Sequence, residues 1–321
     1  MSVIQQLQQL NLKFLKDEPL KNHTTFQIGG PAKYYLELSK TENLMRVLKI
    51  AKEHRLKYLF LGGGSNLLAS DRGFDGLIIK IKPEELKFDD NQVTANSGYI
   101  LAGLIIKCLA AGLTGLEFAA GVPGTVGGAI KGNAGTYGEA MDKIVLSVEF
   151  IDANLELKTF SNQECKFDYR HSIFKEHDDW LITSAALKLE KGDTAASQKL
   201  IQERIGYRMQ SQPYGHPSAG CAFKNIIYTE EIADKLKKLG WEVSPKFKEY
   251  KKIPTAYVIE NLGLKGKTIG QAQISEKHAN YIINLGGATA DEVVQLVSYV
   301  KQQARDALGI QLQEEIRYLG F

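Results

Sequence analysis

Cysteine is scarce in this sequence, and its placement excludes several kinds of site. The three cysteines, Cys108, Cys165 and Cys221, are widely spaced and form no C-x-x-C pair. They can build neither a disulfide framework nor a cysteine-rich zinc site, so we expect a reducing compartment. The six histidines include no pair three or four residues apart, and we expect no metal site.

The sequence also lacks long hydrophobic runs and an excess of one charge. The longest apolar stretch, 100–113, contains Lys107 and is shorter than the roughly 20 residues of a membrane helix. A net charge of +3, from 40 basic and 37 acidic side chains, gives no electrostatic reason for a nucleic-acid or membrane partner. No basic segment followed by an apolar core opens the chain, so no signal peptide is expected. We expect a cytoplasmic protein without membrane insertion, nucleic-acid partner or obligate protein partner.

The length of 321 residues suggests two domains at roughly 150 residues each. Pro213 and Pro217, two of only eight prolines, mark 212–217 as the best candidate for a junction. Hydrophobic spacing predicts an α+β chain. The expected helices cover 1–15, 41–55, 100–111, 195–207, 229–239, 256–262 and 291–308. The expected strands cover 33–38, 58–61, short pieces of 77–97, 144–152, 155–160, 180–190 and 316–319.

Glycine is abundant and unevenly placed. Sixteen of the 30 glycines fall within 62–138, mainly in two segments, 62–68 and 121–138. The dinucleotide fingerprint G-x-G-x-x-G fails, because Leu67 stands at its third glycine. Either segment alone reads as a tight turn at a sheet corner. Together they favour a pyrophosphate site made of consecutive backbone N–H groups.

Several further motifs occur with these segments in one order. They are Tyr169-Arg170-His171-Ser172, residues 217–225, 263–266 and 275–279, and Glu315-Ile316-Arg317. The sequence resembles the UDP-N-acetylenolpyruvoylglucosamine reductases, flavoenzymes of bacterial peptidoglycan precursor synthesis, from about Thr24 to the C-terminus. The resemblance implies an oxidoreductase that reduces UDP-N-acetylglucosamine enolpyruvate, a UDP-sugar, to UDP-N-acetylmuramate, with NADPH as co-substrate.

The resemblance also implies the fold. We expect a vanillyl-alcohol-oxidase-like (PCMH-type) FAD-binding region over 1–208, made of two α+β subdomains, about 1–82 and 83–208. A smaller α+β substrate-binding domain would cover 209–321, with a C-terminal strand that returns to the active site. The FAD is expected to be non-covalent, because 112–138 contains no His or Cys to carry it. The implied cofactor-binding residues are Gly62, Gly63, Gly64, Ser65, Asn66, Leu67, Gly121, Val122, Pro123, Gly124, Thr125, Gly127, Gly128, Asn133 and Ala134.

Three residues carry the catalytic roles that the resemblance implies. Arg170 would pair with the substrate carboxylate or the developing enolate, where its planar fork suits an oxyanion. Glu315 would help polarise the enol system, although its neighbour Glu314 differs from it only by register. Cys221 stands where most relatives carry serine as proton donor. It would give the proton itself or pass one from water.

The implied substrate-binding residues are Tyr169, Arg208, Lys224 and Asn225. The segment 226–252 is longer than in close relatives, and it would close the cleft as a lid or extend the domain; we favour the lid.

Two other classes of protein compete with the reductase. Another PCMH-type FAD oxidoreductase acting on a small molecule would often carry a His or Cys near its glycine loops, whereas a non-catalytic nucleotide-binding protein would not need all three catalytic residues.

Overall fold

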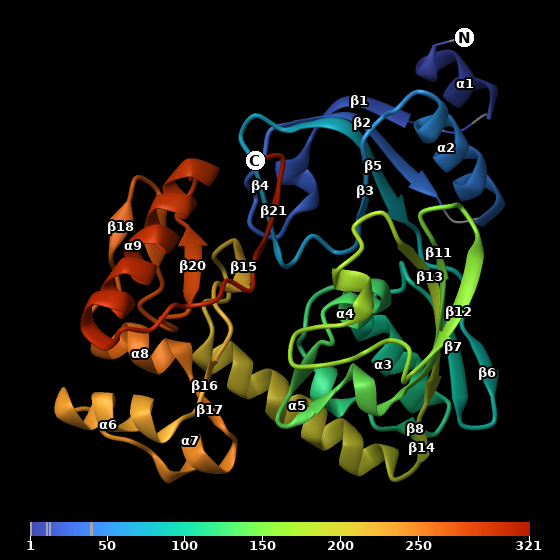
Figure 1. Cartoon of the computed structure of the whole chain (residues 1–321). Coiled ribbons are helices and arrows are strands. Elements are labelled where there is room, and N and C mark those ends of the chain that lie inside the picture. Colours follow the sequence, from blue (N-terminus) through green and yellow to red (C-terminus); the bar gives the residue numbers. More distant parts are fainter. Residues whose placement is uncertain (1, 11, 13, 39–40) are drawn as a thin grey trace. The chain divides into compact units, whose positions relative to one another are not determined.

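The structure, a computed structural model, describes residues 2–10, 12, 14–38 and 41–321 (Figure 1). The chain forms two compact units, and each is described by itself. Unit 1 comprises Met1–Glu18, Pro31–Gly63 and Phe74–Arg208, and unit 2 comprises Pro19–Gly30, Gly64–Gly73 and Met209–Phe321.

Unit 2 takes two segments from the part of the chain that we expected in the FAD-binding region. These are Pro19–Gly30 and Gly64–Gly73. Phe26, Ile28 and Leu68 are buried in the same hydrophobic core as the C-terminal part of the chain. Core packing therefore divides this region differently from the continuous 1–208 of the sequence expectation.

The first half of unit 1 is built on a four-stranded sheet of order β1-β2-β5-β3, in which β5 runs parallel to β2 and β3. Helix α2 packs on this sheet (Figure 1). The elements are α1 (Val3–Gln9), β1 (Phe14–Pro19), β2 (Pro31–Leu38), α2 (Thr41–Glu53), β3 (Tyr58–Leu61) and β5 (Phe74–Ile81).

The N-terminal helix is shorter than the expected 1–15, part of which (residues 1, 11 and 13) lies outside the described residues. It ends at Gln9, and Phe14 already belongs to β1. The Phe14 ring meets Tyr34 of β2 edge to face, 6.4 Å between centroids. Cross-strand packing thus overrides the helical spacing of the apolar residues.

The second half of unit 1 is a five-stranded antiparallel sheet of order β12-β11-β13-β7-β6. Helix α4 packs against β7 and β13, and its apolar residues share a core with those of α3. The main elements are β6 (Lys87–Asp89), β7 (Gln92–Asn96), α3 (Leu101–Ala110), α4 (Val126–Lys131), β11 (Val145–Ile151), β12 (Leu157–Ser161) and β13 (Leu181–Lys188). Two short pairs, β8 (Leu113–Thr114) with β14 (Glu190–Lys191) and β9 (Gly135–Thr136) with β10 (Glu139–Ala140), complete it. Helix α5 (Thr194–Ser211) leads into unit 2.

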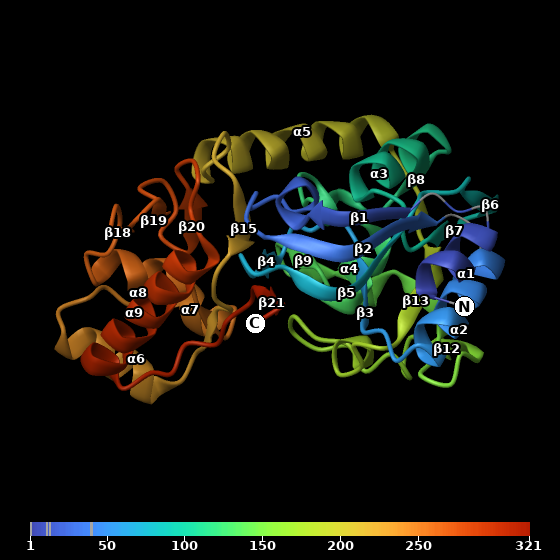
Figure 2. The same cartoon turned by 90° about the horizontal axis from the view of Figure 1, so that it is seen from above.

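Unit 2 centres on a sheet of order β15-β20-β19-β18, with α9 packed along it (Figure 2). A second, parallel pair joins β21 to β4, residue Arg317 opposite Leu67. The elements are β4 (Leu67–Ala69), β15 (Ser218–Cys221), β16 (Ile226–Ile227), α6 (Glu230–Lys238), α7 (Pro245–Glu249), β17 (Lys252–Ile253), α8 (Thr255–Asn261), β18 (Thr268–Ile269), β19 (Ala272–Ile274), β20 (Tyr281–Asn284), α9 (Ala290–Leu308) and β21 (Arg317–Leu319).

The segment 226–252 is part of the unit 2 fold. Its ends pair as β16 and β17, and Leu236 of α6 and Phe247 of α7 are buried in the core of the unit. This packing favours an extension of the domain over the lid that we expected.

No described helix combines the length and the apolar composition needed to span a membrane.

Candidate active site

The start of the first glycine segment, Gly62 and Gly63, meets the second segment in unit 1. A Cβ atom placed on Gly63 would lie 2.8 Å from the Gly124 Cα, and one on Gly62 would lie 2.8 Å from the Thr125 Oγ1. No side chain fits at these distances, so glycine is needed for the two backbones to approach each other. We expected these glycines to approach a ligand; in the structure they first serve the contact between the two segments.

Thr125 begins α4, and its hydroxyl oxygen accepts a hydrogen bond from the Gly128 N at 3.4 Å. Residues 62–63 and 121–134, parts of the glycine segments that lie in unit 1, contain no acidic side chain, and Lys131 is their only charged residue. Beside them, the Ser97 hydroxyl oxygen is buried and has no hydrogen-bond partner among the described residues. A donor-rich surface without carboxylates fits the diphosphate of FAD.

The predicted cofactor residues 62–67 do not all belong to unit 1. Gly62 and Gly63 do, whereas residues from Gly64 onward belong to unit 2. Asn133 is 4% exposed, and its amide binds protein on both sides: Nδ2 donates to the Asp168 carbonyl at 3.0 Å and Oδ1 accepts from the Asp142 N at 3.0 Å. Asn133 therefore anchors the loop that carries Tyr169.

Arg170 stands at a sharp turn. The backbones of Asp168 and His171 exchange hydrogen bonds of 3.1 and 3.0 Å, which leaves Tyr169 and Arg170 at the tip. Arg170 has a left-handed φ of 55°. Its carbonyl accepts from the Lys175 Nζ at 3.0 Å.

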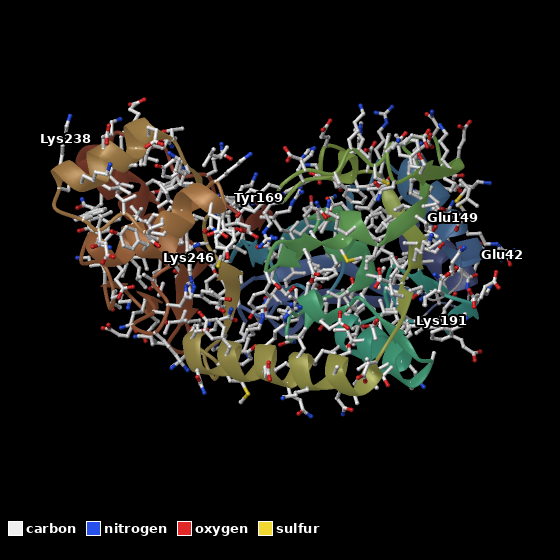
Figure 3. All side chains as sticks on the ribbon, turned by 90° about the horizontal axis from the view of Figure 1, so that it is seen from below. Glu42, Glu149, Tyr169, Lys191, Lys238 and Lys246 are labelled. Atoms are coloured by element: carbon white, nitrogen blue, oxygen red, sulfur yellow. The ribbon has the colours of Figure 1, made fainter. Side chains whose placement is uncertain are left out.

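Two contacts within unit 1 position the Arg170 side chain. Its Nη1 donates to the Gly135 carbonyl at 2.9 Å, and its guanidinium carbon lies 5.4 Å from the centroid of the Tyr169 ring. Tyr169 is labelled in Figure 3. The two predicted residues therefore lie together.

Cys221 and Glu315 are brought together in unit 2. The Glu315 N donates to the carbonyl of Ala222 at 2.8 Å, so the segment after Cys221 lies beside the segment that carries Glu315. The carbonyl of Glu315 in turn accepts from the Asn66 Nδ2 at 2.9 Å. Three sequence motifs far apart along the chain, containing Asn66, Cys221 and Glu315, thus meet in one place.

The choice between Glu314 and Glu315 depends on where each side chain points. The Glu314 carboxylate pairs with Lys301 of α9, 2.6 Å away. Burial raises the pKa of Tyr318, and the hydrogen bond and the charge of Glu314 raise it further. Glu314 is thereby committed to the packing of α9. This favours Glu315 as the functional carboxylate.

The remaining predicted substrate residues of unit 2 follow Cys221. Both contact Thr255, the first residue of α8. The Asn225 Oδ1 accepts a hydrogen bond from the Thr255 N at 3.3 Å, and the Lys224 carbonyl accepts one from the Thr255 Oγ1 at 2.6 Å. At least one atom of the Asn225 amide is thus used to begin a helix.

Arg208 ends unit 1, and its Nε is buried without a hydrogen-bond partner among the described residues. A buried guanidinium nitrogen of this kind suits an anionic ligand.

The two other cysteines are inert by comparison. Cys108 and Cys165 are fully buried, and burial raises the pKa of each thiol to about 12. Neither forms a thiolate at neutral pH. Cys221 is partly exposed.

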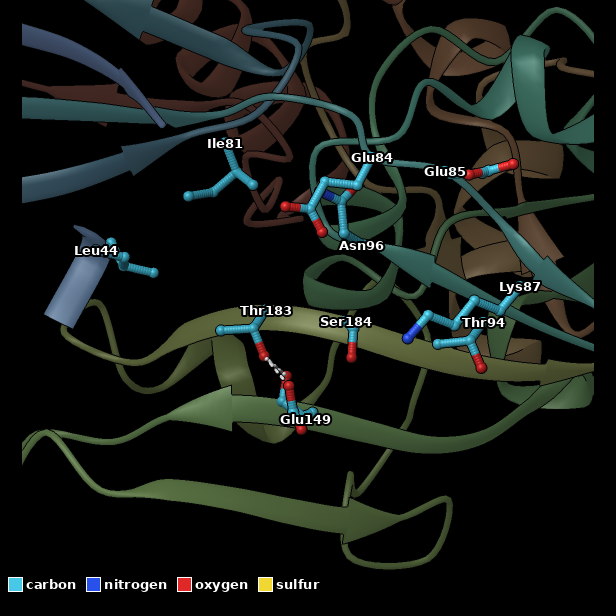
Figure 4. A pocket seen from close by; sticks show the side chains of 10 residues that line it. All are labelled: Leu44, Ile81, Glu84, Glu85, Lys87, Thr94, Asn96, Glu149, Thr183 and Ser184. Carbon is cyan, nitrogen blue, oxygen red and sulfur yellow. Dashed lines mark hydrogen bonds between the residues drawn. The ribbon is translucent and has the colours of Figure 1, made fainter. Parts of the chain in front are cut away.

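Unit 1 contains a separate cavity of about 310 Å³, which none of the predicted site residues lines (Figure 4). Its wall carries Glu84, Glu85 and Glu149, and the Thr183 Oγ1 donates to the Glu149 carboxylate at 2.9 Å. Three carboxylates against one ammonium, that of Lys87, would repel a diphosphate, so this cavity is not the FAD phosphate site.

Sequence reasoning missed Ser97, Lys175 and Asn280. Asn280 is 2% exposed, and its side chain binds both the N and the carbonyl of Phe223, at 3.0 and 2.8 Å. Of these three, only Lys175 could have been suspected from the sequence, because it lies five residues after Arg170. The contacts of Asn280 and the burial of Ser97 depend on segments far apart in the chain, which no spacing in the sequence reveals.

Comparison with known proteins identifies the chain. Residues 32–161 match an FAD binding domain, and residues 212–319 match the C-terminal domain of UDP-N-acetylenolpyruvoylglucosamine reductase. The crystal structure of this reductase (MurB) from Thermus caldophilus superposes with a TM-score of 0.73 and 30% identity, covering 96% of this chain and 98% of that one. The protein is an FAD-containing oxidoreductase, and the PCMH-type FAD-binding fold with a C-terminal α+β domain is confirmed.

The full-length relatives agree. The reductase of Anoxybacillus flavithermus is 35% identical over 319 residues, 98% of each chain, and that of Bacillus subtilis is 34% identical over 99% of this chain and 98% of its own. The chain belongs to the UDP-N-acetylenolpyruvoylglucosamine reductase family.

Proposed function

We propose that this protein reduces UDP-N-acetylglucosamine enolpyruvate to UDP-N-acetylmuramate with electrons from NADPH, as a cytoplasmic step of peptidoglycan precursor synthesis. Residues 1–208 would supply most of the FAD-binding region and residues 209–321 most of the substrate domain. The observation that carries the proposal is the hydrogen bond from Glu315 N to Ala222 O, which sets Cys221 and Glu315 on neighbouring segments.

The reaction needs one hydride and one proton. Bound flavin would supply the hydride chemistry, directed at the terminal methylene carbon of the enol ether. Negative charge then develops on the adjacent carbon and its carboxylate. The work left to this chain is to stabilise that enolate and to deliver the proton.

Each catalytic residue has a role in that work. Arg170 pairs its guanidinium with the carboxylate, and the contact with Gly135 fixes the direction of the fork. Glu315 polarises the enol system. The Cys221 thiol gives its proton to the adjacent carbon, and the thiolate left behind regains a proton from solvent.

The other predicted residues bind rather than react. Tyr169, Arg208, Lys224 and Asn225 contact the UDP-sugar, and the glycine segments hold the non-covalent FAD. The Lys224 ammonium and the Arg208 guanidinium carry the charge that a diphosphate requires.

The test separates the two halves of the reaction. The purified protein should show oxidised flavin absorption that bleaches with NADPH under anaerobic conditions and returns when the enolpyruvyl substrate is added. Cys221→Ala should bleach at the wild-type rate but regain colour at least about 100-fold more slowly, because only the second half needs a proton donor.

Cys221→Ser is the matched control, since a hydroxyl can still donate. We expect it to restore most of the second half-reaction. A Cys221→Ala enzyme with normal turnover would show that Cys221 is not the donor. A protein that binds no FAD would refute the whole proposal.

A further inference from the structure

Ser97 lies where β7 ends and the first turn of α4 begins. Its N donates to the Thr183 carbonyl at 2.8 Å, and its carbonyl accepts from the Gly127 N at 2.9 Å. A Cβ atom on Gly127 would lie 2.7 Å from the Ser97 Cβ. The missing side chain at Gly127 thus makes room for the side chain of Ser97.

The Ser97 hydroxyl is exceptional because it is buried and yet unpaired. The residue is 6% exposed, and its Oγ has no hydrogen-bond partner among the described residues. Other buried hydroxyls of unit 1 do have one: Ser172 donates to the Lys131 carbonyl, Thr183 to Glu149 and Ser197 to Glu117. Folding leaves a buried hydroxyl unpaired only at a cost, so a partner from outside the chain is the simplest explanation.

The neighbours of Ser97 indicate which partner. Gly127 and Gly128 follow Thr125, whose Oγ1 accepts from the Gly128 N and borders Gly62 of the other glycine segment. No carboxylate occurs in residues 121–134. The N–H groups of Gly127 and Gly128 donate within the chain, to the Ser97 carbonyl and the Thr125 Oγ1, so the unpaired Ser97 hydroxyl remains as a donor for a phosphate oxygen.

The adjacent residue gives a contrast. The Asn96 Oδ1 is also buried without a partner among the described residues, but it is an acceptor, and Asn96 lines the cavity that contains Glu84, Glu85 and Glu149 (Figure 4). An acceptor among carboxylates disfavours an anion. The donor at Ser97 favours one.

We propose that Ser97 is a cofactor-binding residue whose hydroxyl donates a hydrogen bond to a phosphate oxygen of bound FAD. The inference rests on the proposed FAD site at the glycine segments. It adds a side-chain donor, supplied by the end of β7, to a site otherwise made of backbone.

The test measures binding and stability of the protein after its FAD has been removed. FAD is titrated back and followed by flavin fluorescence, with thermal unfolding of the FAD-free protein measured in parallel. Ser97→Ala should weaken FAD binding about tenfold, the effect of one charge-assisted hydrogen bond. The FAD-free variant should be as stable as wild type or more stable, because an unpaired hydroxyl has been removed.

Two further ligands locate the contact. ADP contains the diphosphate, and its binding should weaken in parallel; riboflavin lacks phosphate, and its binding should not change. Ser97→Cys, of similar size but with a weak donor, should behave like Ser97→Ala.

Ser197→Ala is the matched control, because its hydroxyl already donates to Glu117. It should lower the melting temperature without changing the FAD dissociation constant. Wild-type affinity of Ser97→Ala for FAD and ADP would overturn the inference while leaving the proposed function intact. Failure of the wild-type protein to bind FAD would overturn both.

Discussion

At the scale of single residues, Arg170 combines backbone strain with a candidate catalytic role. Its φ of 55° is left-handed, a conformation that costs a residue with a side chain roughly 1 kcal/mol relative to glycine. The Lys175 ammonium donates a hydrogen bond to the Arg170 carbonyl, and the Arg170 guanidinium donates one to the Gly135 carbonyl. These contacts stabilise a strained turn that presents the side chain, as is common at functional sites.

Two substitutions separate the strain from the chemistry. Arg170→Gly and Arg170→Ala remove the same guanidinium, and both should lose most product formation while keeping reduction of the flavin by NADPH. Urea unfolding should show Arg170→Ala to be about 1 kcal/mol less stable than Arg170→Gly, since only alanine keeps a Cβ at positive φ. Equal stabilities would mean that the turn is not left-handed in solution.

At the scale of elements, a single asparagine fixes the strand end that carries Cys221. Asn280 precedes β20, and its side chain pairs with both backbone groups of Phe223, while its carbonyl accepts from the Ala222 N at 2.7 Å. The chain beyond β15 is thereby held in register next to Glu315.

Asn280→Ala should therefore destabilise the protein strongly. It leaves two buried backbone groups of Phe223 without partners, which costs roughly 2–4 kcal/mol in the free energy of unfolding. Asn261→Ala is the control, because the Asn261 side chain makes one exposed hydrogen bond to Tyr257 and its loss should cost less than about 1 kcal/mol. Denaturant titration of both variants measures the difference, and similar losses would contradict the role given to Asn280.

At the scale of the whole molecule, His278 gives folding a pH dependence. Burial is the main reason that the pKa of His278 lies below 6.5. The charge of Lys265 lowers this pKa further, whereas the charge of Glu260 raises it. The His278 Nδ1 accepts a hydrogen bond from the Asn280 N at 3.3 Å, which requires the neutral ring.

The sign of the effect follows from proton linkage. Below about pH 6.5 the unfolded state binds a proton that the folded state resists, so stability should fall as the pH drops from 7 toward 5. His278→Asn keeps an acceptor but does not titrate, and its stability should fall less over this range. His216→Asn is the control, because the His216 side chain is exposed. An unchanged pH profile in His278→Asn would refute the assignment, and thermal unfolding at several pH values supplies the measurement.

Much of the fold could be predicted from local signals. Helical spacing of apolar residues located α2, α3 and α9, and β-branched runs located β11 and β13, because one buried face per element leaves a period in the sequence. Phe14 shows the limit: its helical spacing was real, but a cross-strand contact with Tyr34 decided its structure.

By itself the sequence determined the order of elements, the two glycine segments and, through its motifs, the family of FAD-containing reductases. Only the tertiary structure decided that Gly64–Gly73 joins unit 2, that Glu315 lies beside Ala222, and that Glu314 turns to Lys301. It also showed that Asn133 and Asn225 hold the chain itself and that Ser97 has an unpaired hydroxyl. The reason is physical: periodicity records which face of an element is buried, whereas the partner of a polar side chain is set by segments far away in the sequence.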